Sequence, residues 1–164
     1  VIPKEIRRTL RIREGDPLEI FTDREGGLIL KKYSPIGELT DFSKDYAESL
    51  QQAIGNIVLI ADKDAFISMS GAPKKDYVDR KISSELEKIM DDRKTVMLSD
   101  GGSLIPLHND DSESDYVSQV ISPIIAEGDA IGAVIIVSKE GGKLGELEAK
   151  LAETAAGFLG RQME

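Results

Sequence analysis

Apolar residues recur three or four positions apart in two long stretches of the chain, and this spacing predicts two amphipathic helices. The apolar positions of the first helix are Leu39, Phe42, Tyr46, Leu50 and Ile54, and Gly55 ends it. The second helix closes the chain, and its apolar positions are Leu144, Leu147, Leu151, Ala155, Phe158 and Leu159. We expect these six to form one stripe, which contacts either the core or a second subunit.

Between the two helices, short apolar runs bounded by turn-forming residues predict strands. The predicted strands are residues 56–61, 65–70, 95–98, 116–126 and 130–138. The last two are rich in Ile and Val, which indicates a central, covered position in the sheet. Ser84 and Glu87 have the spacing of a capping box, so a third helix is expected from there to about Asp92. This order of elements is typical of an α+β fold with an antiparallel sheet flanked by helices.

The first ten residues carry a shorter pattern. Residues 1–2 are expected to end a strand, and Pro3 suits the first turn of a helix, where its missing N–H costs nothing. In the helix predicted over residues 4–10, Ile6 and Leu10 are four positions apart and are expected to form a buried stripe.

A predicted hairpin follows this short helix. Residues 18–22 and 28–33 read as strands, joined by a loop rich in turn formers at residues 23–27. A hairpin and one short helix leave most of their apolar surface in water, so we expect this part to dimerise or to pack on residues upstream of Val1. We therefore expect a small domain at residues 1–34, a linker at 35–37 and a larger domain at 38–164.

Charge divides the chain at the same place. The formal net charge is −9, but residues 1–34 hold eight Lys and Arg against six Asp and Glu. Residues 35–164 hold thirteen against twenty-four, so a slightly basic tip precedes an acidic body. The basic residues of the tip cluster early, at Lys4, Arg7, Arg8, Arg11 and Arg13. Such a tip suits a polyanion such as DNA, and the body repels one.

Within that cluster, Lys4, Arg7 and Arg8 are the candidate DNA contacts. Arg offers a fixed charge and a forked set of donors, which favours a contact with phosphate. Arg11 and Arg13 rank lower, because Glu14 and Asp16 stand close enough to offset their charge.

Composition argues against most enzymatic chemistry. The chain has no Cys, which excludes disulfides, thiol nucleophiles and Cys-based zinc sites. Its apolar runs are too short to span a bilayer, it shows no signal-peptide pattern, and its start at Val1 suggests further residues upstream. We expect a cytoplasmic protein without cofactor or metal.

Three polar features could be functional sites, but the residue pattern around each of them does not support that interpretation. His108 is the single histidine; it is expected to be solvated in a polar loop over residues 101–115, and no nucleophile elbow surrounds Ser103. The acidic run at residues 110–115 lacks the Gly and Glu that an EF-hand requires. Residues 141–142 are two glycines outside any Walker pattern, and we interpret them as a turn.

Two groups of segments resemble known families. Residues 1–10 (VIPKEIRRTL), 15–20 and 29–33 closely resemble the AbrB-type swapped-hairpin DNA-binding domain. The resemblance implies an obligate dimer whose hairpins interleave, with dimers pairing into tetramers, and DNA contacts through Arg7 and Arg8. The first strand of that family would lie before Val1.

The remainder looks like the GAF domain of a family of sporulation regulators, on the evidence of residues 121–125, 128–133 and 153–159. Together the resemblances imply a non-enzymatic regulator, associated with the nucleoid, that binds promoter DNA of endospore genes. The GAF-like domain would assemble the protein or bind an unknown small ligand. Two alternatives stay open: a small-molecule sensor with secondary DNA binding, and an antitoxin-type protein that binds a toxin.

Overall fold

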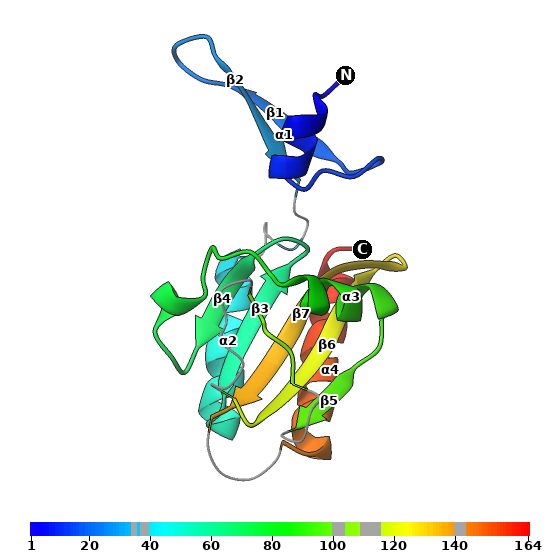
Figure 1. Cartoon of the computed structure of the whole chain (residues 1–164). Coiled ribbons are helices and arrows are strands. Elements are labelled where there is room, and N and C mark those ends of the chain that lie inside the picture. The colour runs from blue at the N-terminus through cyan, green and yellow to red at the C-terminus, as the bar shows by residue number, and fades with distance from the viewer. Residues whose placement is uncertain (34–35, 37–39, 100–103, 109–115, 140–143) are drawn as a thin grey trace. The chain divides into compact units, whose positions relative to one another are not determined.

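The computed structural model describes residues 1–33, 36, 40–99, 104–108, 116–139 and 144–164. The chain divides into two compact units, Val1–Ser34 and Pro35–Glu164 (Figure 1). Among the described residues, no helix is long and apolar enough to cross a membrane.

The first unit consists of a short helix and a hairpin. Its elements are α1 (Lys4–Thr9), β1 (Leu18–Thr22) and β2 (Leu28–Lys32). The strands pair antiparallel, with Ile20 opposite Leu30 and Phe21 opposite Ile29. Residues 1–2 form no strand, contrary to the prediction, because a strand exists only where another strand pairs with its main chain.

None of the described residues of the first unit is buried. Ile6 is 44% exposed and Leu10 is half-buried, so the unit's own residues do not bury the stripe predicted on α1. The unit has no second layer to cover that face. Large apolar side chains stand exposed at Val1, Ile6, Ile20, Phe21, Leu28 and Ile29.

The second unit is built on one five-stranded antiparallel sheet. Its elements are α2 (Thr40–Ile54), β3 (Ile57–Asp62), β4 (Phe66–Ser70), η2 (Lys74–Asp76), α3 (Ser84–Asp92), β5 (Val96–Ser99), β6 (Ser118–Ala126), β7 (Asp129–Ser138) and α4 (Glu146–Gln162). The strand order is β4-β3-β7-β6-β5, which places the apolar strands β6 and β7 inside the sheet as predicted. The α+β prediction is confirmed.

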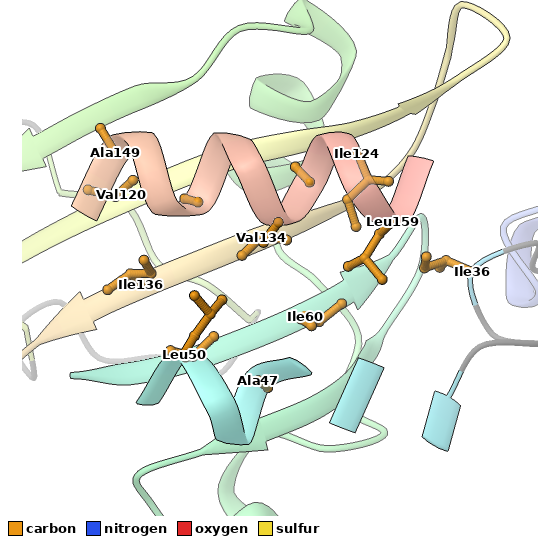
Figure 2. Packing of buried hydrophobic residues seen from close by; sticks show 14 of the residues in the cluster. Ile36, Ala47, Leu50, Ile60, Val120, Ile124, Val134, Ile136, Ala149 and Leu159 are labelled. Carbon is orange, nitrogen blue, oxygen red and sulfur yellow. The ribbon is translucent and has the colours of Figure 1, made fainter. Parts of the chain in front are cut away.

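Helices cover both faces of the sheet (Figure 1). On one face, α2 and α4 enclose a buried cluster that includes Leu50, Ile60, Val134 and Leu159 (Figure 2). On the other face, α3 covers a second cluster. Ile36 belongs to the first cluster and is fully buried, although it lies in the stretch expected to be a linker.

Helix α4 meets the sheet through small residues. Its buried positions are Ala149, Ala152, Ala155, Ala156, Leu159 and Gly160. A Cβ at Gly160 would clash with the Ile125 carbonyl oxygen, so the helix backbone approaches β6 too closely for any side chain. The predicted six-residue stripe is therefore partly wrong, because Leu147 (65% exposed) and Phe158 (39%) lie on another face of α4.

The N-terminal cap of α3 is Ser83 and not the predicted Ser84. The Ser83 hydroxyl, and not that of Ser84, accepts a hydrogen bond from the Leu86 N–H at 3.1 Å. At the other end, Arg93 adopts a left-handed conformation, and its Nε donates to the Gly128 carbonyl in the β6–β7 turn at 2.9 Å. Both ends of α3 are thus fixed by side chains.

Candidate nucleic-acid interface

The three candidate DNA contacts share one face of α1. Lys4, Arg7 and Arg8 are exposed, and their spacing of three and four residues places them side by side on a helix. Pro3 starts the helix, since its carbonyl accepts hydrogen bonds from the N–H groups of Ile6 (3.1 Å) and Arg7 (3.0 Å). The structure thus brings all three candidates together.

A tight reversal ends α1 and follows the basic face. The Ile12 N–H donates to the Arg7 carbonyl (2.8 Å) and the Arg11 N–H to the Arg8 carbonyl (3.3 Å), as in a Schellman motif. Arg11 holds the left-handed position, with φ of 55°, where glycine is usual. This reversal turns the chain away directly after the two arginines.

Asp16, one of the acidic residues of the first unit, is engaged by partners outside α1. The Asp16 carboxylate accepts a hydrogen bond from the Arg13 main-chain N–H (2.8 Å) and lies 4.0 Å from Lys32 Nζ. Lys32 Nζ also donates to the Arg11 carbonyl at 2.9 Å, which ties the end of the hairpin to the reversal after α1. These interactions fix the base of the unit around α1.

Such a face can bind a phosphate backbone. Exposed guanidinium and ammonium groups on a short helix donate hydrogen bonds and charge to phosphate oxygens, without a preformed cavity. In the described residues no group of three or more His, Asp and Glu side chains is placed to hold a metal ion.

The structure corrects the prediction for His108. The side chain is 7% exposed, and its ring meets the Tyr77 ring edge-on, with 4.8 Å between centroids. Tyr116 donates a hydrogen bond from its hydroxyl to that of Tyr77 at 2.7 Å. A lone histidine in a polar stretch gave no signal for this burial. Ser103, the acidic run 110–115 and the glycines 141–142 lie outside the described residues.

A second feature that the sequence did not predict is an aromatic contact between helices α2 and α4. The rings of Phe42 and Phe158 stack with 5.6 Å between centroids, and Tyr46 lies 5.8 Å from Phe158. Phe42 and Phe158 are both about two-fifths exposed, at 41% and 39%. This stack therefore continues the face of α4 that carries Leu147.

Comparison with known families identifies both units. Residues 1–38 match the family model described as "Antidote-toxin recognition MazE, bacterial antitoxin". Residues 38–164 match the model described as "Stage V sporulation protein T C-terminal, transcription factor". The first 38 residues are thus similar to a bacterial antitoxin family, and the rest to a transcription-factor family.

Two proteins of Bacillus subtilis (strain 168) are similar in sequence. Stage V sporulation protein T is 57% identical over all 164 residues, and the match covers 90% of that protein. The transition state regulatory protein AbrB is 46% identical over 65 residues, a match that covers 36% of this chain and 60% of AbrB.

Solved structures agree on the fold of the larger unit. A GAF domain from a phosphoenolpyruvate-protein phosphotransferase of Coxiella burnetii has a TM-score of 0.63 at 18% identity, covering 76% of this chain and 82% of its own. A free methionine-R-sulfoxide reductase from Thermoplasma acidophilum has a TM-score of 0.61 at 10% identity, covering 78% and 94%. At such identities the likeness shows the GAF fold alone. The full-length identity and the family model together confirm the predicted resemblance: the chain belongs to the family of stage V sporulation protein T, transcription factors that regulate sporulation.

Proposed function

We propose that this transcription factor binds promoter DNA as a homodimer through the basic face of α1, with Lys4, Arg7 and Arg8 as its phosphate contacts. The observation that carries the proposal is the gathering of these three exposed cations on one short helix, in a chain of net charge −9. On such a chain, attraction to DNA has to arise locally, from neutralised phosphates and released counterions.

The dimer follows from the exposed apolar surface of the first unit. Its six large exposed apolar side chains cannot be covered by the unit's own helix and hairpin. A second copy of the same unit covers both sets, and two-fold symmetry presents two α1 helices to the two-fold symmetry of duplex DNA. The domains would then be residues 1–34 for DNA binding and 38–164 for regulation, joined at 35–37.

The larger unit acts by assembly and not by catalysis, without cofactor, in the cytoplasm and on the nucleoid. The exposed stack of Phe42 and Phe158, continued by Leu147, offers an apolar face on which a second dimer can pack to give a tetramer. A small ligand that binds this unit would favour one of two packings of the helices. The change in DNA affinity cannot exceed the difference between the ligand's affinities for those two packings.

The decisive experiment removes the basic face and matches the charge loss elsewhere. Arg7→Ala with Arg8→Ala in the full chain should weaken binding to a promoter fragment at least about tenfold, or roughly 1.4 kcal/mol. Arg80→Ala with Arg161→Ala removes the same charge from exposed positions of the larger unit and should leave the affinity unchanged. Equal effects of the two pairs in a mobility-shift titration would reject the assignment.

Assembly is tested separately by sedimentation. The unaltered chain should sediment as a tetramer at micromolar concentration, and Phe158→Ser should reduce it to a dimer. A chain that stays monomeric would contradict the shared hydrophobic surface.

If DNA affinity is unchanged on deletion of residues 38–164, the larger unit does not regulate binding, which would favour a sensor or an antitoxin-type role.

A further inference from the structure

Two buried hydroxyls lie between helix α2 and the sheet. The side chains of Ser43 on α2 and Ser68 on β4 are 0% and 3% exposed. Among the described residues, neither hydroxyl oxygen has a hydrogen-bond partner. Buried polar groups in folded proteins almost always have a partner, and each group left without one costs free energy. Both hydroxyls therefore point to a partner that the chain's own groups do not supply.

The two side chains point into the same layer. Ser43 precedes Ala47 and Leu50 by four and seven positions, which places it on the face of α2 that packs on the sheet. Ser68 pairs with Ile60 of β3, and residues directly opposite each other in antiparallel strands share a face. Because Ile60 lies in the cluster that α2 covers, Ser68 faces α2 as well (Figure 2).

The two hydroxyls also lie at a similar height along α2 and β4. Helix α2 is joined to β3 by two residues and packs against it, so it runs opposite to β3, as β4 does. The ends of α2 and β4 meet, since a Cβ at Gly71 would lie 3.0 Å from Gln51 Cγ. From there Ser43 is eight residues back along the helix, about 12 Å, and Ser68 three residues back along the strand, about 10 Å. The two serines therefore face each other across the interface.

Strand β4 is irregular at this height. Its register with β3 shifts next to Ser68, so that Ile67 is the extra residue of a bulge. Bulges redirect side chains and are frequent beside functional sites. Opposite the bulge, a serine that faces a serine fills less of the interface than a larger pair such as Leu50 and Ile60. The position thus combines two short polar side chains with a locally altered strand.

We propose that the hydroxyls of Ser43 and Ser68 bind one water molecule between α2 and β4. A hydroxyl both donates and accepts, so a single bridging water satisfies the two groups together. The bridge fixes the rotation of α2 about its axis, and the residue before Ser43 is Phe42 of the exposed aromatic stack. The water site therefore sets how that stack is presented. It requires neither DNA binding nor assembly of the chain.

The first test compares the thermal stability of alanine variants of the full chain. If a water bridges the hydroxyls, Ser43→Ala and Ser68→Ala each remove a hydrogen bond and should lower the Tm by about 2–4 °C. If no water is bound, each substitution removes a buried group without a partner, and the Tm should rise. Ser49→Ala, at an exposed position of α2, is the matched control for alanine in this helix. A Tm of Ser43→Ala at or above that of Ser49→Ala would overturn the proposal.

The double variant tests whether the two hydroxyls share one water. Once either hydroxyl is removed the bridge is lost, so the Tm loss of Ser43→Ala with Ser68→Ala should be clearly smaller than the sum of the two single losses. Additive losses would contradict a shared water. Magnetic relaxation dispersion of the water oxygen nucleus counts internal waters with long residence times, and the double variant should hold one fewer than Ser49→Ala. Equal counts would exclude the site.

Discussion

The two units of this chain differ in where their stability comes from. In the larger unit, two clusters on opposite faces of one sheet hold fully buried side chains such as Ile135 and Leu159. In the first unit, none of the described side chains is buried, and Ile20 and Leu28 are largely exposed. The larger unit buries its apolar residues within one chain, whereas the smaller one has to bury them against something else. Four pairs of matched variants test this contrast and the packing of the larger unit.

The largest expected effect comes from the same truncation made in both units. Ile135→Ala should lower the free energy of unfolding of the larger unit by about 2–5 kcal/mol, because it leaves a cavity in a packed core. Ile29→Ala in the hairpin should change that quantity by less than about 0.5 kcal/mol and weaken dimerisation instead. Urea melts at several protein concentrations separate the two outcomes. Comparable losses of unfolding free energy from both variants would contradict this difference between the two units.

Next comes a pair of glycines on α4. Gly160→Ala should destabilise the larger unit by about 1–3 kcal/mol, because the new methyl group meets the Ile125 carbonyl of β6. Gly157→Ala, one turn earlier and with nothing within 4 Å of its Cβ, should stabilise it by about 0.5–1 kcal/mol. Thermal melts of the two variants should therefore shift in opposite directions, and shifts of the same sign would contradict the close packing of α4.

A smaller effect is expected at the start of α3. Ser83→Ala should cost about 0.5–2 kcal/mol of stability, since it removes the hydroxyl that caps the helix. Ser84→Ala, at the position that the sequence pattern favoured, should cost almost nothing. Denaturant titrations of the two variants decide between the caps, and a larger loss at Ser84 would restore the sequence-based assignment.

The smallest effect concerns charge. Lys4→Ala should weaken DNA binding about threefold and flatten the salt dependence of the affinity by about one unit of slope, because one phosphate is then no longer neutralised. Lys44→Ala removes the same charge from an exposed position on α2 and should change neither quantity. Affinities measured across a series of salt concentrations provide the comparison, and parallel changes in both variants would indicate a nonspecific charge effect.

Periodicity predicted the elements well because it reflects burial within one chain. The helix that ends at Gly55 and the hairpin of β6 and β7 were both predicted within about two residues, the usual uncertainty at element ends. The same reasoning failed at two positions of α4, because Leu147 and Phe158 point to another face than its buried residues. A pattern of apolar residues does not tell a buried position from an exposed one.

The candidate site was easier to predict than the interior of the larger unit. Lys4, Arg7 and Arg8 are close in sequence, so helical spacing alone places them together. The burial of His108 involves Tyr77, which is distant in the chain and meets it only through the fold. Contacts of that kind leave no local trace in the sequence.

The exposed hairpin also bears on the lifetime of a newly made chain. A two-stranded sheet leaves unpaired main-chain groups along the outer edges of β1 and β2, beside the exposed side chains of Ile20 and Leu28. Such edges invite aggregation with other nascent polypeptides, and a unit without a core is readily cleaved by proteases. A chain that leaves the ribosome and meets a second copy quickly escapes both fates. The surface that we propose to join two copies therefore also limits how long a single copy survives.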